Sequence, residues 1–192
     1  SQLAEPACAK KAKEGRASDI KPCINCLIGC IDRGMLSHTP IHCTVNPSLY
    51  RFECKPVEKA ETRKQVAVVG AGPAGCEAAL TASKRGHQVT IYEKRCIGGA
   101  MIEASKPENK ANIKRLIHYY EDHIMHDPNI TLVKEEVEYE TLVHSGYDAV
   151  IIAVGGKTRI LNVPGIEKNS VIYASDYLNG STAVTGNTVV VI

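Results

Sequence analysis

Apolar residues recur with two alternating periods through the middle of the chain, and these periods predict short strands joined by helices. Residues 66–69 form a valine-rich run that stops at Gly70, which is typical of a buried strand. Residues 73–84 have the composition of a helix, and Gly86 follows where a helix is expected to end. Residues 88–92 then alternate as a second strand. This order predicts a βαβ unit with two parallel strands.

A longer helical pattern and further strands follow this unit. Apolar residues recur at helical spacing between Pro107 and Pro128, which predicts an amphipathic helix that covers the sheet. These residues are Ile113, Leu116, Ile117, Tyr120 and Ile124. Residues 130–134 and 136–142 predict a small β excursion. Residues 149–154 form the most apolar run of all, and we expect this strand to lie in the centre of the sheet.

The alternation of strands and helices predicts the α/β class, with a three-layer, Rossmann-like fold and a mostly parallel sheet over residues 65–187. Residues 1–64 hold six of the eight cysteines and show little apolar periodicity, so they need stabilisation from outside a conventional core. Residues 189–192 are a β-branched apolar run with no turn or cap after it. Because the chain starts with Ser and stops on this run, we expect it to be part of a longer polypeptide.

Composition and charge exclude several classes of protein. The 23 basic and 21 acidic residues leave a net charge of +2, so charge indicates neither a nucleic acid nor any other partner. The contents of 44% hydrophobic and 23% charged residues exclude a disordered chain. The charge-free apolar runs fall well short of the roughly 18 residues that a membrane span needs. Clustered cysteines without a secretory signal indicate a reducing compartment, and we expect a cytoplasmic location.

A glycine-rich turn links the first predicted strand to the first predicted helix. Gly70, Gly72 and Gly75 form the pattern Gly-x-Gly-x-x-Gly at this turn. The first glycine permits a sharp turn, the second lets main chain approach a pyrophosphate, and the third allows close packing of helix on strand. The N–H groups at the helix start then face the phosphates. The alternative is an ordinary strand-to-helix turn, but the surrounding βαβ pattern favours a dinucleotide site.

Glu93 ends the second predicted strand, 18 residues after Gly75. A carboxylate near this position accepts hydrogen bonds from the ribose of an adenosine, so a free 2′-hydroxyl is expected rather than a 2′-phosphate. The alternative for Glu93 is a solvated charge at the end of a strand. Gly98 and Gly99 follow shortly, and there we expect a second close approach of main chain to the dinucleotide.

Four cysteines of the N-terminal segment have a spacing typical of a metal centre. Cys23, Cys26, Cys30 and Cys43 form the pattern C-x2-C-x3-C-x12-C. Three thiolates from a compact loop and one remote thiolate suit an iron–sulfur cubane. Zinc is one alternative, although structural zinc more often uses two C-x2-C pairs, and four unrelated buried cysteines are another.

The other cysteines share no spacing, and we assign them no chemistry. They are Cys8, Cys54, Cys76 and Cys96. Because no C-x4-C pair follows Gly99, a redox-active disulfide is not expected in the dinucleotide-binding fold. Electrons that reach this fold must therefore leave it by another route.

Seven short segments together carry a resemblance to a known family. They are KPCINC (21–26), GC (29–30), CTVNP (43–47), VGAGPAG (69–75), YDAVIIAVG (147–155), VPG (163–165) and ASDYLNG (174–180). Their combination resembles the old yellow enzyme-like iron–sulfur flavoproteins, which include NADH:flavin oxidoreductases, 2,4-dienoyl-CoA reductase, 2-enoate reductase and trimethylamine dehydrogenase. The resemblance runs from about residue 9 to the end of the chain.

The resemblance implies a TIM barrel that carries FMN, followed by the cysteine segment and by an FAD domain that is interrupted by a nicotinamide domain. On this basis residues 1–64 are the end of a barrel helix plus the iron–sulfur segment. Residues 65–187 are an incomplete FAD-binding or ADP-binding domain, and residues 188–192 are the first strand of a truncated NAD(P)-binding domain. The implied partners are the rest of the same polypeptide and a small-molecule substrate, and a homo-oligomer is compatible with them.

The motifs and the resemblance assign two sets of site residues and no catalytic residue. The four cysteines of the spacing pattern are the metal ligands. The cofactor-binding residues are Gly70, Gly72, Pro73, Ala74, Gly75, Glu93, Lys94, Gly98, Gly99, Ala153 and Gly155. The implied cofactors are a 4Fe-4S cluster and FAD, with ADP as the alternative to FAD. FMN and NAD(P)H belong to domains outside this chain.

The resemblance implies the electron-transfer portion of an NAD(P)H-dependent oxidoreductase. Electrons then pass from FAD through the cluster to FMN, for reduction of an activated C=C bond in an enoate or dienoyl-CoA type of substrate. One alternative is an amine dehydrogenase of the trimethylamine dehydrogenase type, with ADP in the nucleotide site and an external electron acceptor. A second alternative is a zinc-stapled nucleotide-binding module without redox activity. The chain alone is expected to be inactive.

Overall fold

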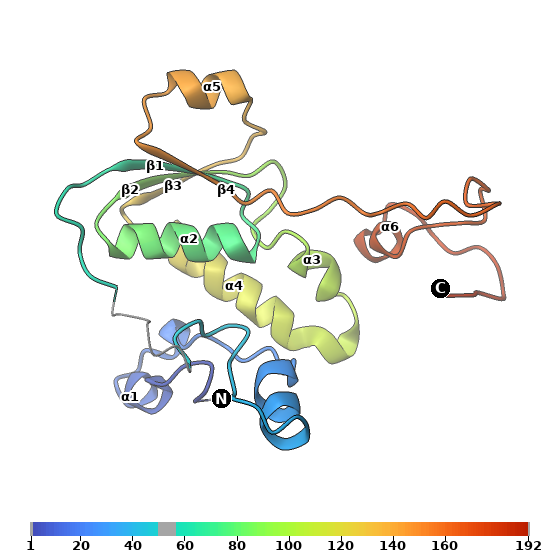
Figure 1. Ribbon diagram of the computed structural model, residues 1–192, viewed down its shortest axis with the longest axis horizontal. Helices are drawn as coiled ribbons and strands as arrows, with labels where there is room; N and C mark the ends of the chain where they lie inside the picture. Colours follow the sequence, from blue (N-terminus) through green and yellow to red (C-terminus); the bar gives the residue numbers. More distant parts are fainter. Residues whose placement is uncertain (1, 50–56, 192) are drawn as a thin grey trace.

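A parallel sheet lies at the centre of the structure, a computed structural model that describes residues 2–49 and 57–191 (Figure 1). Its described strands are β1 (Gln65–Val69), β2 (Gln88–Tyr92), β3 (Ile130–Val133) and β4 (Ala149–Ile152), in the order β3-β2-β1-β4. All three pairings are parallel, and they align Val66 with Val89, Val66 with Ala149, and Val89 with Ile130. The predicted α/β class with a parallel sheet is confirmed.

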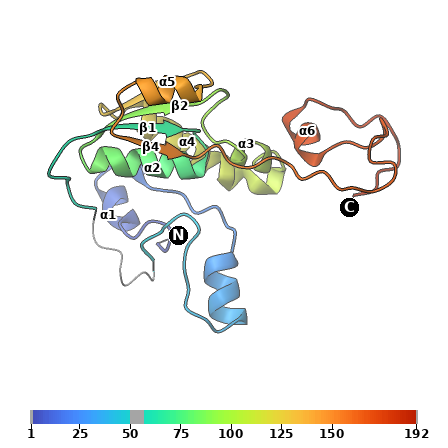
Figure 2. The same ribbon diagram turned by 45° about the horizontal axis from the view of Figure 1, so that its top comes forward.

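Helices lie on both faces of this sheet. The α-helices are α1 (Cys8–Lys13), α2 (Pro73–Lys84), α3 (Met101–Ala104), α4 (Ala111–Met125), α5 (Tyr139–His144) and α6 (Ala174–Asn179). Two short 3-10 turns, η1 (Ala17–Asp19) and η3 (Glu108–Lys110), and the π-helical stretch η2 (Ile28–Leu36) complete the helical segments of the described chain. Figures 1 and 2 show α2 and α4 on one face of the sheet and α5 on the other, which gives three layers.

The βαβ unit forms where the apolar pattern predicts it. Helix α2 begins with Pro73 directly after Gly72, where the missing proline N–H costs no helical hydrogen bond. It ends before Gly86, which has the left-handed φ of +96° and donates its N–H to the Ser83 carbonyl at 2.7 Å. The chain can therefore turn directly into β2 at Gln88.

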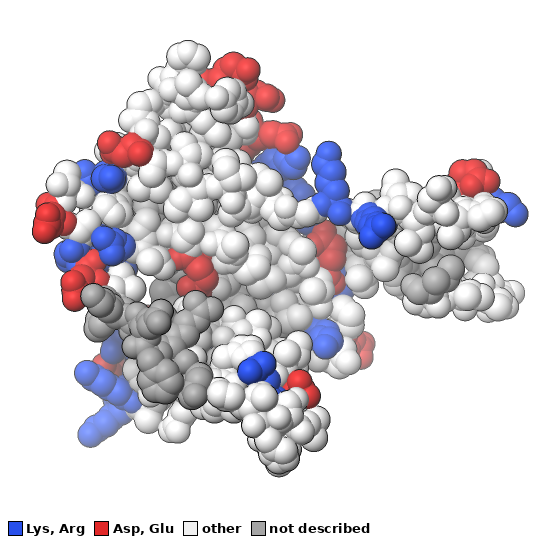
Figure 3. Space-filling view, in the orientation of Figure 1, with Lys and Arg blue, Asp and Glu red and all other residues white. Residues whose placement is uncertain are grey.

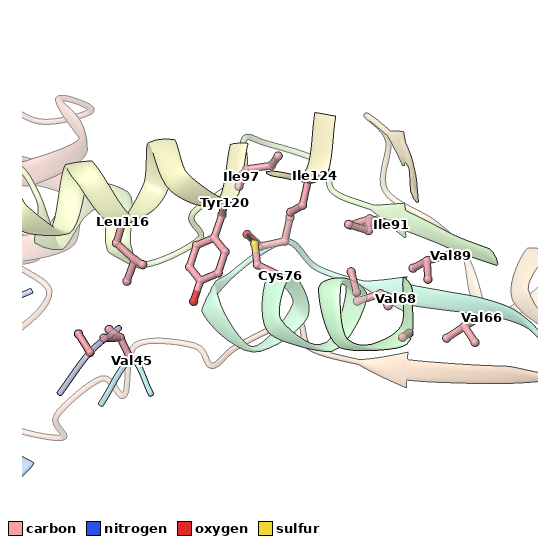
Figure 4. Packing of buried hydrophobic residues seen from close by; sticks show 14 residues of the cluster. Val45, Val66, Val68, Cys76, Val89, Ile91, Ile97, Leu116, Tyr120 and Ile124 are labelled. Carbon is pink, nitrogen blue, oxygen red and sulfur yellow. Dashed lines mark hydrogen bonds between the residues drawn. The ribbon is translucent and has the colours of Figure 1, made fainter. Parts of the chain in front are cut away.

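One core fills the space between the sheet and the two long helices (Figure 4). Its largest fully buried side chains are Val68, Cys76, Val89, Ile91, Tyr120 and Ile124. Leu116, Tyr120 and Ile124 recur every four residues along α4, so the apolar face of this helix is buried, as predicted. Val45 of the N-terminal segment joins the same core, and the cysteine segment therefore packs against the dinucleotide-binding fold.

The β excursion expected at residues 130–142 is confirmed in its first strand and wrong in its second. Residues 130–133 form β3, which pairs with β2 inside the main sheet, and residues 139–144 form α5. Short segments with few apolar residues fit the helical period and the strand period about equally well. Local periodicity alone therefore did not distinguish this helix from a strand.

The position predicted for the most apolar strand is also wrong, because β4 lies at the edge of the described sheet and not at its centre. It pairs with β1 alone among the described strands, and its Ile152 side chain remains 65% exposed. An apolar composition indicates that the faces of a strand can be buried under other segments. Its place in the sheet depends instead on which strand pairs with it, and that pairing is not visible in local composition.

The strand predicted at the C-terminal end is not formed in residues 188–191, while Ile192 lies outside the described residues. Figures 1 and 2 show the chain after β4 leaving the sheet and extending past α3 through α6. A strand requires a neighbour for its hydrogen bonds, and Val190 and Val191 are instead more than 80% exposed in the described structure.

The charge distribution agrees with the small net charge. Figure 3 shows basic and acidic side chains interspersed over the visible face, with no broad field of one sign. Among the described helices, none combines the length and the apolar character that crossing a membrane would require.

Two neighbouring residues of α4 test whether its buried face stabilises the fold. Ile124 is 2% exposed and Met125 is 63% exposed. We expect Ile124→Ala to lower the free energy of unfolding by about 2–5 kcal/mol, because it removes buried apolar surface and leaves a cavity. The matched variant Met125→Ala is expected to change it by less than about 0.5 kcal/mol. Urea unfolding followed by far-UV circular dichroism measures both, and equal losses would contradict the described packing.

Candidate functional site

The glycine-rich turn lies at the carboxyl edge of the parallel sheet, between the end of β1 and the start of α2. Gly70 has a φ of +98° and donates its N–H to the Tyr92 carbonyl of β2 at 2.8 Å. A Cβ on Gly70 would stand 2.4 Å from the carbonyl oxygen of Ala153, which directly follows β4. The turn is therefore wedged between the ends of two neighbouring strands, where only glycine fits.

The other glycines of the motif also lie against main chain. A Cβ on Gly75 would approach the Gly70 carbonyl oxygen to 1.9 Å, so the first turn of α2 packs directly on the end of β1. A Cβ on Gly99 would approach the Cα of Gly72 to 2.9 Å. The Gly98 N–H donates to the Ala71 carbonyl at 2.8 Å. The structure therefore brings the three glycines of the motif together with Gly98 and Gly99 in one surface that is free of side chains.

The Glu93 carboxylate reaches this turn. It accepts hydrogen bonds from the N–H of Ala71 at 2.8 Å and from the N–H of Arg95 at 2.7 Å. Glu93 therefore lies beside the glycine turn, and its carboxylate has further lone pairs for a ribose hydroxyl. The sequence did not predict that Glu93 also holds the turn itself.

The other residues predicted to bind the dinucleotide lie around the same edge of the sheet, and they differ in how closely other parts of the chain surround them. Pro73 and Ala74 start α2, and Ala153 donates its N–H to the Val69 carbonyl at 2.8 Å. Gly155 has a left-handed φ of +73° and has open space where a Cβ would stand. Lys94 points to Glu136, with 2.7 Å between Nζ and Oε1, and this ion pair is exposed.

Cys76, to which the sequence assigns no chemistry, lies buried in the first turns of α2. Burial raises the pKa of its thiol to about 12. The thiol donates a hydrogen bond to the Ala71 carbonyl at 3.3 Å. The Cys76 thiol therefore stays protonated at neutral pH and stabilises the turn. Cys96 is exposed and has no described hydrogen bond to this turn. Cys54 lies outside the described residues.

The four cysteines of the spacing pattern line one small cavity in the N-terminal segment. Its other walls include Leu3, Ile24, Leu27 and His42. The N–H of Asn25 points to the Cys23 sulfur at 3.4 Å, and the Cys26 sulfur lies 3.1 Å from the Thr44 hydroxyl. In the described parts of the chain, however, no three Cys, His, Asp or Glu side chains converge closely enough to hold a metal ion as they stand.

The backbone around these cysteines is tightly constrained. Asn25 and Leu27, on either side of Cys26, adopt left-handed φ values of 53° and 58°. Such values are uncommon outside glycine and are found where surrounding structure imposes them, often at functional sites. A Cβ on Gly29 would stand 2.5 Å from the His42 carbonyl oxygen, so the segment before Cys30 lies against the segment before Cys43. The fold therefore brings the remote fourth cysteine back to the other three.

The cysteine segment is fastened to the dinucleotide-binding fold. Cys23 and Cys43 are partly buried and pack against the core that contains β1 and α2. Asn46 is buried and donates its side-chain N–H to the Leu3 carbonyl at 2.8 Å. Lys21 forms an ion pair with Glu77 of α2, a link between residues 56 positions apart that sequence analysis missed because no local pattern signals it.

A hollow of about 670 Å³ in the described structure does not coincide with the glycine turn. It runs beside α2 from Pro73 to Arg85, and its walls include Val45, Val66 and Ile151. Because these walls are mainly apolar and include none of the motif glycines, we assign the dinucleotide site to the turn and not to the hollow.

Comparison with known proteins identifies similar sequences and structures. Residues 64–192 match the family described as pyridine nucleotide-disulphide oxidoreductase. The chain is 38% identical to the NADH oxidase of Thermoanaerobacter brockii over 94% of this chain, and 31% identical to the cinnamate reductase of Clostridium sporogenes over 99% of it. The chain spans 28% of the length of each of these relatives.

Solved structures share this fold as well. A 2-naphthoyl-CoA reductase complex superposes with a TM-score of 0.89 at 33% identity, over 95% of this chain and 28% of the other. Histamine dehydrogenase from Rhizobium sp. 4-9 superposes with a TM-score of 0.73 at 30% identity, over 82% of this chain and 24% of the other. Because the first of these alignments covers 95% of this chain, it extends over both the cysteine segment and the dinucleotide-binding fold.

The close approach at Gly75 makes a direct test of the turn. We expect Gly75→Ala to lower the free energy of unfolding by about 1–3 kcal/mol, because the new methyl group meets the Gly70 carbonyl and must displace main chain. Gly156→Ala is the control, because open space surrounds Gly156, and it is expected to stay within about 0.5 kcal/mol of the parent. Thermal and urea unfolding measure both. An unaffected Gly75→Ala protein would contradict the contact between α2 and β1.

Proposed function

Because this chain belongs to the pyridine nucleotide-disulphide oxidoreductase family, we propose that it is the electron-transfer portion of an NAD(P)H-dependent iron–sulfur flavoprotein. Its relatives include the old yellow enzyme-like flavoproteins that its motifs resemble. In the proposed function, the chain connects an FAD site through a 4Fe-4S site to an FMN site elsewhere in a longer polypeptide. The reaction served is the reduction of an activated C=C bond.

One observation carries this proposal: the four-cysteine cavity and the glycine turn belong to segments that share one core. Cys23 and Cys43 pack against the same buried cluster as Val68 of β1 and Cys76 of α2. Electron transfer between two centres requires that they lie close together in a fixed arrangement. A metal ion that only stabilised the N-terminal segment would not require a fixed position relative to the glycine turn.

The chain's own residues can hold a dinucleotide at the glycine turn. Gly72 and Gly99 keep the surface free of side chains, so that a pyrophosphate can approach the main chain. The N–H groups of the first turn of α2 provide donors and the positive end of the helix dipole for the phosphates. Glu93 provides an acceptor for ribose hydroxyls at the adjoining strand end.

The cysteine segment provides four thiolates and an apolar wall for a cluster. Cys23, Cys26, Cys30 and Cys43 would be the ligands, since all four line the same cavity. The Asn25 N–H directed at the Cys23 sulfur is the kind of contact that stabilises a metal-bound thiolate. When bound, flavin and cluster supply two-electron and one-electron redox chemistry respectively, which no side chain provides.

The chain contains no C-x4-C pair after Gly99, although its family is named for disulphide oxidoreductases. A thiol pair at the flavin is therefore not part of the proposal, and the cysteine segment is the route by which electrons leave. The cinnamate reductase and 2-naphthoyl-CoA reductase relatives support an unsaturated acid or its CoA thioester as the class of substrate. No described residue of this chain is proposed to act on that substrate, whose site we assign to another domain.

A second candidate function is supported by the similarity to histamine dehydrogenase. In an amine dehydrogenase, electrons would leave the FMN through the cluster for an external acceptor, and the glycine turn would hold ADP. Extraction of the cofactors distinguishes the two functions. Bound FAD supports the reductase, whereas stoichiometric ADP without FAD supports the amine dehydrogenase.

The proposed cluster is tested by single substitutions of its ligands. We expect each of Cys23→Ser, Cys26→Ser, Cys30→Ser and Cys43→Ser to lose most of the iron and sulfide and the visible absorption of anaerobically purified protein. Cys96→Ser is the matched control, because Cys96 is exposed and outside the cavity, and its iron content should equal that of the parent. Iron-free parent protein, or stoichiometric zinc in its place, would eliminate the redox function.

The proposed role of Glu93 is tested by Glu93→Gln. We expect the affinity for FAD or ADP to fall about tenfold or more, because a charged acceptor for the ribose is lost. Glu140→Gln is the control, since Glu140 is exposed in α5, on the opposite face of the sheet from α2. Isothermal titration with ADP and with its 2′-phosphorylated form measures the effect. Parent protein that preferred the 2′-phosphate would contradict the assignment of Glu93.

A further inference from the structure

The link between Lys21 and Glu77 joins the two segments to which the cofactor sites are assigned. The Lys21 ammonium forms an ion pair with the Glu77 carboxylate. Lys21 precedes the first cysteine of the spacing pattern by two residues. Glu77 lies in the first half of α2, two residues after Gly75. One ion pair therefore connects the start of the cysteine segment with the helix that begins at the glycine turn.

The surroundings of this pair distinguish it from an ordinary surface ion pair. The Lys21 side chain is only 12% exposed. Its Nζ lies 5.9 Å from the ring centroid of Tyr119 and 5.6 Å from that of Tyr120, within the range of cation–π attraction. The Tyr120 hydroxyl also donates a hydrogen bond to Glu77 Oε1 at 2.8 Å. Helix α4 therefore supports the contact between the cysteine segment and α2.

Burial determines the protonation of this cluster. Desolvation by burial raises the pKa of Tyr119 to about 12, and burial beside the Glu77 carboxylate raises the pKa of Tyr120 as well. Both hydroxyls therefore stay protonated, and Tyr120 remains a hydrogen-bond donor to Glu77. The side chain of Glu77 is 37% exposed, so it retains contact with solvent on one side.

We propose that Lys21 and Glu77 are a positioning pair that fixes the four-cysteine cavity relative to the glycine turn and sets the electrostatic environment of the cluster. The inference rests on the proposed electron-transfer function. An ion pair that only stabilised the fold could lie anywhere on the N-terminal segment. This one has its lysine two residues before the first cysteine of the spacing pattern. Its glutamate lies in α2, the helix that follows the dinucleotide-binding turn.

The pair has two consequences for electron transfer. The rate of electron transfer falls steeply with the distance between centres, so loosening the link slows the step between them. A positive charge beside an iron–sulfur cluster raises its reduction potential, and a negative charge lowers it. In the intact pair the two charges largely offset each other.

Removing Lys21 and removing Glu77 are therefore expected to shift the reduction potential of the cluster in opposite directions. In Lys21→Met, the partly exposed Glu77 carboxylate is left without its cation, and the cluster potential is expected to fall. In Glu77→Gln, the Lys21 ammonium is left without its anion, and the potential is expected to rise. In the double variant both charges are gone, so the potential is expected to return toward that of the parent. Damage to the fold alone would move both single variants in the same direction.

The experiment is a spectroelectrochemical titration of anaerobically purified protein, preceded by iron and sulfide analysis of every variant. Arg16→Met and Glu14→Gln are the matched controls, because Arg16 and Glu14 form an exposed ion pair in the same N-terminal segment. Neither control is expected to shift the potential. When NAD(P)H reduces the full-length flavoprotein in a stopped-flow experiment, electron transfer from FAD to the cluster is expected to be at least tenfold slower in both single variants. The rate is expected to recover in Lys21→Arg, which retains the cation.

The outcomes separate this inference from the proposed function. Iron-loaded variants whose potentials are unshifted, or shifted in the same direction, overturn the positioning pair and leave the redox function intact. Iron-free parent protein overturns the redox function and the positioning pair together. Opposite shifts with recovery in the double variant support the pair. If Lys21→Met loses its iron, Glu77→Gln decides the question: a potential above those of the parent and of Lys21→Arg supports the pair, and a potential that is unchanged or lower overturns it.

Discussion

The close approach of main chain to main chain at the turn after β1 is the constraint on which the structure depends. Gly70 packs against the backbone that follows β4, Gly75 against Gly70, and Gly99 against Gly72. These contacts leave no room for side chains, and they bring the ends of three strands and the start of α2 to one point. Glu93 and Cys76 hold the same turn through hydrogen bonds to Ala71. The candidate dinucleotide site is the surface that this packing creates.

Local pattern was sufficient to predict this part of the molecule. The strands β1 and β2 and the helix α2 follow directly from valine-rich runs, the proline at the helix start and the glycine after its end. The apolar stripe of α4 has the period of a helix over fifteen residues, which is long enough to exclude a strand. The roles of Gly70 and Gly75 could be predicted because the fingerprint states a steric requirement and not merely a composition.

Local pattern failed where long-range contacts decide the structure. The segment that forms α5 is too short for its period to identify a helix, and the most apolar strand, β4, lies at an edge because its described pairing is with β1 alone. The spacing of the four cysteines predicted that they belong together, and they do share a cavity. Spacing could not predict that Val45 enters the core or that Lys21 reaches Glu77, since these contacts join segments that are far apart in sequence.

The outer edge of β4 has a consequence for handling this chain. Its backbone hydrogen-bonding groups face away from β1 without a described strand beside them, and Val150 and Ile152 expose apolar surface on the same strand. An open, apolar strand edge is a template for pairing with other chains. Concentrated preparations of these 192 residues are therefore expected to self-associate through β4 unless another strand or a blocking charge occupies that edge. Solubility would in this case be limited by a feature remote from both cofactor-binding segments.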